Sequence, residues 1–316
     1  IDDFLESAKK GHPQAQFLLG DLYFHGDEID QNYSEAFYWY TKSADQNFSY
    51  AQNNLGFMYA NGYFVNQDYQ QAFSWYKKAA EQGLALSQYN LGLFYANGYG
   101  VKQNYKEAMN WYKKAAEQGE PGAQNSIGLL YDNGWGVVKN HSEAIDWYKK
   151  AAIQGEPSAQ FNLAHCYEEE CDFKNAILWY EKSARQGYDG AQYNLGRMYY
   201  YGIGVKIDYE KAKSLFEEAS ANGHCNATTL LADIYHNGGY GVSKNYKKAF
   251  ELYQQAGKQG SEWALFNLGF MFFCGEGISK DDFKAFKFME QAADKDAATA
   301  KLLLSCMYKN GDGVEK

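Results

Sequence analysis

The chain has 316 residues, of which 46% are hydrophobic and only three are proline, a composition that suits a packed protein and argues against a disordered one. Its net charge is −9 and no cluster of Lys and Arg stands without acidic neighbours, so we expect no nucleic-acid partner. No apolar run approaches the ~20 residues of a membrane helix, and the five cysteines lack the spacing of a disulfide framework.

One sequence unit recurs along the whole chain. Its anchor is a leucine or isoleucine followed by a small residue, and successive anchors lie 36 residues apart, with one spacing of 32 and one of 37. The anchors are Leu19-Gly20, Leu55-Gly56, Leu91-Gly92, Ile127-Gly128, Leu163-Ala164, Leu195-Gly196, Leu231-Ala232, Leu268-Gly269 and Leu304-Ser305. A period in this range is typical of a solenoid, in which each repeat buries its apolar face against its neighbours. We therefore expect one continuous domain over residues 1–316.

Each repeat holds two helical patterns, a helix A and a helix B. The small anchor residue of helix A, such as Gly92, is expected where a neighbouring helix approaches closely, because an interior glycine costs ~1 kcal/mol of helix propensity. In the loop that follows, such as residues 97–101, the first glycine ends helix A in a left-handed conformation and the second permits another positive φ. Helix B, for example residues 105–118, carries an apolar stripe that includes Trp111 and Tyr112.

The complete pattern carries a family resemblance. Helix A and its loop read A-Q-x-N-L-G-x-x-Y-x-x-G-x-G-V, helix B ends on W-Y-x-K-A-A-x-x-G, and residues 50–155 follow this pattern almost letter for letter. The pattern resembles the Sel1-like repeat, a relative of the tetratricopeptide repeat, over essentially the whole chain. The resemblance implies an all-α, right-handed solenoid of antiparallel helix pairs, about 18 helices in total. It also implies a protein–protein interaction scaffold or adaptor. The sequence contains no Gly-x-Ser-x-Gly, His-Glu-x-x-His or Cys-x-x-Cys motif, so we expect no enzyme activity, metal or cofactor.

The repeat pattern sets the expected boundaries. An orphan helix B over residues 1–10 comes first and an orphan helix A over residues 298–309 comes last. Between them we expect eight repeats, at about 13–47, 49–83, 85–119, 121–155, 157–187, 189–223, 225–260 and 262–295. Repeat arrays need polar caps, which both ends lack, and Ile1 is not an initiator Met. We therefore expect a fragment of a longer protein, or end-to-end contacts between copies.

Several repeats depart from the pattern. Glu28 and Phe64 stand at or near the place of the second loop glycine in repeats one and two. The loop of repeat five, residues 168–172, is four residues short and contains no glycine, which should locally change the superhelix. Repeat seven has one additional residue within positions 238–241.

Repeat five also holds the best candidate for chemistry. It contains His165, Cys166, Glu168, Glu169 and Cys171. His165 and Glu169 are four residues apart on one helix, a spacing that allows a metal site or an acid–base pair. The alternative is a solvated acidic helix end, with Cys166 as a small core residue. The other histidines, scattered over loops and helix ends, are expected at the surface.

The binding face is predicted from the residues left over after the core is assigned. In a stacked solenoid the A helices line the concave side, and positions −2, −1, +2 and +5 from each anchor leucine share one face. The candidate partner-binding residues on this face are Phe17, Asp21, Asn53, Asn54, Phe57, Tyr89, Asn90, Leu93, Asn125, Phe161, Asn162, His165, Tyr193, Asn194, Arg197, Asp233, Phe266, Asn267 and Phe270.

Two interpretations of the asparagines stay open. An amide side chain both donates and accepts, so a row of them can clamp the backbone of an extended segment, while the aromatic residues provide apolar pockets. Related tetratricopeptide repeats contact peptides through an asparagine at the corresponding place, which is what the resemblance implies here. Alternatively, each asparagine satisfies the preceding turn of the neighbouring helix, and the aromatic residues at position −2 belong partly to the core.

Three functions are therefore weighed. The first is a scaffold that binds an extended segment or a helix of a partner protein, as a monomer or with weak end-to-end self-association, without membrane insertion. The second is a metal-dependent or hydrolytic activity centred on repeat five. The third is a self-assembling architectural array. Neither the partner nor the compartment, cytoplasmic or exported, is indicated by the sequence.

Overall fold

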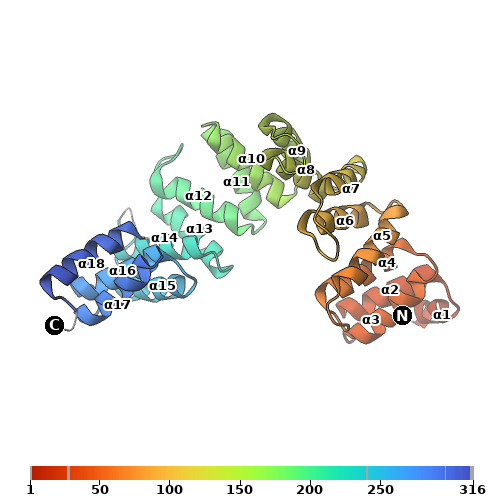
Figure 1. The fold of residues 1–316 in the computed structure, drawn as a ribbon, viewed down its shortest axis with the longest axis horizontal. Helices are drawn as coiled ribbons and strands as arrows, with labels where there is room; N and C mark the ends of the chain where they lie inside the picture. The colour runs from red at the N-terminus through yellow and green to blue at the C-terminus, as the bar shows by residue number, and fades with distance from the viewer. Residues whose placement is uncertain (1, 27–28, 240, 296, 314–316) are drawn as a thin grey trace. The chain divides into compact units, whose positions relative to one another are not determined.

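The computed structural model describes residues 2–26, 29–239, 241–295 and 297–313, and within them the chain forms eighteen helices, as predicted (Figure 1). The A helices are α2 (Pro13–His25), α4 (Ser49–Asn61), α6 (Ala85–Asn97), α8 (Pro121–Asn133), α10 (Pro157–Glu169), α12 (Asp189–Tyr201), α14 (Cys225–Asn237), α16 (Glu262–Cys274) and α18 (Ala298–Asn310). The B helices are α1 (Asp2–Lys9), α3 (Tyr33–Ala44), α5 (Tyr69–Glu81), α7 (Tyr105–Glu117), α9 (His141–Ile153), α11 (Phe173–Arg185), α13 (Tyr209–Ala221), α15 (Tyr246–Lys258) and α17 (Asp282–Ala293). The β pairing in the described residues amounts to one isolated bridge, between Gly239 and Val242.

The chain divides into two compact units, an N-terminal unit of residues 1–159 and a C-terminal unit of residues 160–316. Inside each unit an A helix packs along the B helix that follows it, and that B helix packs against the next A helix, as α6, α7 and α8 do (Figure 1). Each unit is therefore a stack of helix pairs. That residues 1–316 form a single continuous domain stays a prediction. None of the helices within the described ranges is long and apolar enough to cross a membrane.

The glycine of the anchor pair lies where the tyrosine of helix B meets helix A. A Cβ atom on Gly92 would lie 2.5 Å from the ring of Tyr112, whose side chain is almost completely buried. Gly20, Gly56 and Gly128 meet the tyrosine of their own repeat in the same way. The predicted reason for the interior glycine, close approach of a neighbouring helix, is confirmed, and the approaching group is an aromatic ring.

The loop glycines adopt the predicted conformations. Gly98 ends α6 with φ 75° and Gly100 has φ 63°, so both lie in the left-handed region that favours glycine. Where glycine is replaced, Phe64 and Cys171 themselves take positive φ values of 65° and 60°. Glu28 and Tyr240, which belong to the irregular loops of repeats one and seven, lie outside the described residues.

The solvent side of helix B shows a contact that the sequence pattern did not predict. In four successive repeats the lysine three residues after the tryptophan lies over the indole ring, at 3.9 Å for Lys78 over Trp75 and 3.8 Å for Lys182 over Trp179. The Lys-Lys pairs are thus partly fixed by cation–π contacts that cover the tryptophan.

Candidate partner-binding surface

The asparagines one residue before the anchor leucine point toward the preceding repeat. Asn54 donates from Nδ2 to Oδ1 of Asp21 over 3.0 Å. Asn267 makes the equivalent bond to Oδ1 of Asp233, at 3.4 Å, and Asn90 donates to Oδ1 of Asn53, at 3.2 Å. These amide groups therefore hydrogen-bond from one repeat to the next inside the chain, and this use of the NH₂ group competes with its use on a partner backbone.

Asn53 and Asn125, two residues before the anchor, are both buried. Asn53 accepts a bond of 2.9 Å from the hydroxyl of Ser87 and donates to Asn54. Asn162 is half-buried. Of the predicted asparagines, those one residue before the anchor are the more accessible.

Three clusters on the A helices combine a carboxylate, the tyrosine of helix B and an asparagine of the next repeat. We call them the carboxylate triads, and they consist of Asp21, Tyr40 and Asn54, of Glu168, Tyr180 and Asn194, and of Asp233, Tyr253 and Asn267. In each, the phenol donates to the carboxylate, over 2.5 Å to Asp21 and Asp233 and over 2.9 Å to Glu168. Burial raises the pKa of the Asp21 and Asp233 carboxyls above their usual range, and the bond from the tyrosine opposes this shift.

The Asp233 triad lies at a cleft in the C-terminal unit with a volume of about 560 Å³. We call this the aromatic cleft; α12, α14, α15 and α16 line it with Tyr200, Tyr201, Leu230, Asp233, His236, Asn237, Tyr253, Trp263, Phe266, Asn267 and Phe270. Four predicted binding residues, Asp233, Phe266, Asn267 and Phe270, are therefore brought together in one concave site. Cavities of this size, mostly apolar with a few fixed polar groups, are typical ligand sites.

A smaller cleft of about 140 Å³ adjoins the Asp21 triad in the N-terminal unit. Phe24, His25, Tyr40, Asn54 and Phe57 line it, and the ring of Phe57, which is 42% exposed, stacks on Tyr63. Phe17 packs at the same end of the unit, among Tyr40, Phe48 and Tyr50.

The remaining predicted aromatic residues are mostly occupied in packing. Tyr89 is half-buried and its ring would lie 2.9 Å from a Cβ atom on Gly122 of the next A helix. Phe161 contacts the rings of Tyr180 and Tyr188, Tyr193 stacks on His224 with 4.6 Å between ring centroids, and Leu93 packs against the core of repeat three. The interpretation that aromatic residues at position −2 belong partly to the core is supported by these contacts.

The residues of repeat five are not gathered into a metal site. Nδ1 of His165 is 3.8 Å from Oε2 of Glu169, and both side chains are exposed. Cys166 is buried and Cys171 is exposed, while Glu168 belongs to its carboxylate triad. The described part of the chain contains no group of three or more His, Cys, Asp or Glu side chains placed to hold a metal ion.

Several residues of the aromatic cleft were missed by the sequence argument. Trp263 stands five residues before its anchor, outside the Trp-Tyr pattern of the B helices, and this unusual position was the available signal. His236, expected at the surface, has a side chain only 14% exposed and places Nε2 2.8 Å from Oε2 of Glu276. The rule that histidines in loops and at helix ends are exposed fails there because the side chain turns inward between repeats seven and eight.

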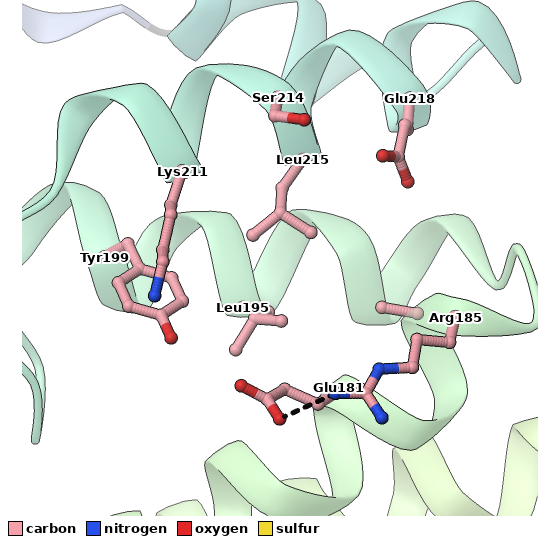
Figure 2. Close-up of a pocket in the computed structure, with 9 residues that line it drawn as sticks. Glu181, Arg185, Leu195, Tyr199, Lys211, Ser214, Leu215 and Glu218 are labelled. Carbon is pink, nitrogen blue, oxygen red and sulfur yellow. Dashed lines mark hydrogen bonds and ion pairs between the residues drawn. The ribbon is translucent and has the colours of Figure 1, made fainter.

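A second cleft in the C-terminal unit, of about 270 Å³, lies on the B-helix side between α11, α12 and α13 (Figure 2). Leu215 lines it and stands where earlier repeats have the tryptophan, and Glu218 stands where they have the stacked lysine. Around it, Figure 2 shows Lys211 and Tyr199 at one end and the pair of Glu181 and Arg185 at the other. The smaller Leu215 side chain accounts for this cleft, whose two acidic and two basic side chains give it no net preference for charge.

The stacked helix pairs and their clefts on the A helices define an α-solenoid repeat protein. The Sel1 repeat family model matches nine segments, residues 13–48, 49–84, 85–120, 121–156, 157–188, 190–224, 226–261, 264–296 and 298–316. The chain belongs to the Sel1 repeat family, as its pattern predicted. Proteins of this family are repeat scaffolds that bind other proteins, and their solenoids are generally non-catalytic.

Solved structures and curated proteins agree with this assignment. A Sel1 repeat protein from Oxalobacter formigenes superposes with a TM-score of 0.65 at 30% identity, covering 97% of this chain and 89% of that one. A protective antigen of uropathogenic Escherichia coli with the same repeat fold has a TM-score of 0.60 at 30% identity, covering 99% and 83% of the two chains. The HRD3A component of the ERAD-associated E3 ubiquitin-protein ligase of Arabidopsis thaliana is 38% identical over 63 residues, which are 20% of this chain and 9% of HRD3A.

Proposed function

We propose that this chain is an interaction scaffold that binds an extended segment or a helix of a partner protein on its A helices. The aromatic cleft is the observation that carries the proposal. Tyr201 from α12 and Trp263 and Phe270 from α16 line one cleft together with the buried carboxylate of Asp233, which comes from α14 between them. Large rigid rings provide contact area at low entropic cost, and such residues dominate the binding energy of protein interfaces.

Complex assembly is the setting that the likeness to HRD3A supports, and interaction with a host is the one that the likeness to a bacterial antigen supports. Both are consistent with the same binding mode. Asn90 and Asn267 take part through their carbonyl oxygens, because their NH₂ groups bond to Asn53 and Asp233 of the preceding repeat.

Affinity capture from the native host tests the proposal. The bait is the full chain, compared with its Trp263→Ala and Phe270→Ala variants. We expect the partner to be retained by the unchanged chain and lost from both variants, because each substitution removes a ring from the aromatic cleft. Quantitative mass spectrometry measures the ratio of partner to bait.

The matched control is Trp135→Ala. Trp135 and Trp263 are both 45% exposed. Trp135, however, lies in the loop after α8, where it stacks on Tyr105, and it does not line the aromatic cleft. Equal loss of partner in all three variants would assign the effect to general damage. Full retention by the Trp263 and Phe270 variants, with unchanged helical circular dichroism, would contradict binding at this cleft.

A further inference from the structure

The aromatic cleft combines flat rings with an acidic group. The ring centroids of Trp263 and Phe266 are 5.3 Å apart with 24° between the planes, and those of Phe266 and Phe270 are 6.2 Å apart with 23° between the planes. Three stacked rings therefore follow one another along α16. Neither Lys nor Arg is among the described residues that line the cleft. The imidazole of His236 is already paired with the carboxylate of Glu276. A ligand that enters therefore meets aromatic faces and the carboxylate of Asp233.

Asp233 accepts from neutral donors. Its Oδ1 takes bonds from the hydroxyl of Tyr253 and from Asn267, and its Oδ2 takes one of 3.3 Å from the indole Nε1 of Trp263. An ionised carboxylate has about four acceptor sites, so these three bonds leave one. Since none of the three donors is charged, the triad itself supplies no cation to the carboxylate.

In the Glu168 triad, the carboxylate is paired with a cation from the chain itself. Glu168 accepts from Tyr180 as Asp233 accepts from Tyr253, and the guanidinium of Arg197 forms an ion pair with Glu168. Arg197 comes from the A helix of the next repeat, two residues after its anchor leucine. Glu168 itself stands at position +5 of its repeat, one helical turn beyond the place of Asp233, yet its carboxylate meets the tyrosine of helix B in the same way.

Repeat eight has Phe270 at the position that Arg197 occupies in repeat six. The next repeat therefore offers Asp233 a ring in place of a guanidinium, and the aromatic cleft opens beside that ring. We propose that this cleft binds an arginine side chain of the partner segment, with its guanidinium stacked on the aromatic faces and paired with Asp233. A guanidinium is planar, is weakly hydrated and stacks on aromatic rings while it hydrogen-bonds a carboxylate. This inference rests on the proposed function and names the chemistry that the partner presents.

Fluorine NMR of the full chain labelled with 5-fluorotryptophan tests the inference. Trp263 lines the cleft, and among the seven tryptophans its signal is identified by Trp263→Phe. The probes are N-acetyl-arginine methylamide and the citrulline and norleucine analogues, which lack the charge. We expect a saturable shift with a dissociation constant of about 1 mM for arginine, as suits a ligand of this size, and binding at least about tenfold weaker for citrulline. Equal shifts with arginine and citrulline, or none at about 50 mM arginine, overturn the inference.

Variants give a second test. Phe270→Arg copies the arrangement of Arg197, so it should remove the response to arginine and raise the melting temperature. Asp233→Asn should weaken arginine binding at least about tenfold, which is the loss of about 1.4 kcal/mol, and leave the response to norleucine unchanged. Asp21→Asn makes the same change in the N-terminal unit and should leave the Trp263 signal unaffected. An unchanged arginine affinity in both cleft variants overturns the inference.

The two proposals fail in different ways. If citrulline binds as well as arginine while the partner is still lost from Trp263→Ala, the cleft recognises shape and the scaffold function stands. If Trp263→Ala and Phe270→Ala both retain the partner, partner binding at the aromatic cleft is refuted, regardless of the result of the NMR titration.

Discussion

One glutamine pair between helices is incomplete, and its completion should stabilise the chain. In repeat three Gln118, at the end of helix B, donates from Nε2 to Oε1 of Gln88 on helix A over 2.8 Å, and four other repeats have the same pair. In repeat six the helix A partner is Gln192, whose Nε2 donates to Glu218. Its Oε1 is buried and has no hydrogen-bond partner among the described residues, because the shorter Asn222 stands where Gln118 stands in repeat three.

The substitution Asn222→Gln adds the methylene that the other repeats have. A buried acceptor without a partner costs about 1–3 kcal/mol, and ordering a glutamine side chain costs up to ~2 kcal/mol. We therefore expect a net gain of about 1 kcal/mol in the free energy of unfolding. Urea unfolding followed by circular dichroism measures it as a higher midpoint at an unchanged slope.

The reciprocal substitution is the matched control. Gln118→Asn shortens the donor of repeat three and leaves Oε1 of Gln88 without its bond, so it should lower the unfolding free energy by about the same amount. If neither variant moves the midpoint, or if both move it in one direction, the unpaired oxygen of Gln192 is not the cause and the reasoning is refuted.

Three further predictions concern packing, backbone and charge. Gly92→Ala places a Cβ atom 2.5 Å from the ring of Tyr112, so we expect a loss of about 1–3 kcal/mol in urea unfolding although alanine is the better helix former. Cys171→Gly relieves a left-handed residue with φ 60° and should raise the unfolding free energy by about 1 kcal/mol; a lower midpoint would contradict this. Burial raises the pKa of Asp233, so between its usual and its raised pKa the native state binds more protons than the unfolded state and stability falls as pH rises. Urea midpoints measured from about pH 4 to 7 should show this slope flattened in Asp233→Asn.

Most of the fold was predictable because each repeat carries the same sequence signals for its two helices and for the loop between them. The 36-residue period gave the helix pairs, and the left-handed glycines such as Gly98 gave the helix ends. The cation–π contact of Lys78 with Trp75 was not predicted, because a Lys-Lys pair on a helix face looks the same in sequence whether its side chains are solvated or stacked. The pattern also did not indicate that residues 1–159 and 160–316 each form a compact unit, because the series of anchor pairs continues without a gap from Ile127-Gly128 to Leu163-Ala164.

For the candidate site, the sequence indicated which helix face carries it but not the contacts that its residues make. Positions counted from the anchor leucine put Phe266, Asn267 and Phe270 on one face of their helix because helical geometry fixes direction, and in the structure the three line one cleft. What each asparagine bonds to depends on the neighbouring repeat: Asn54 reaches Asp21, 33 residues earlier, and Asn267 reaches Asp233, 34 residues earlier. An acidic residue about one repeat before an asparagine would have indicated these hydrogen bonds. Counting positions within one repeat does not reveal it, because the two residues belong to different repeats.

The proposed binding site depends on a small number of positions that the stacking does not fix. The anchor leucine and its glycine are committed to the core, so they cannot vary without loss of packing. The residue two positions after the anchor differs among repeats: Arg197 pairs with the carboxylate of the preceding repeat, whereas Phe57 and Phe270 each line a cleft beside one. On the function proposed above, the residue at this position therefore decides whether the carboxylate of the preceding repeat is paired within the chain or lies beside a cleft. We therefore expect substitutions at this position to alter partner binding while the anchor leucine, its glycine and the stacking stay the same.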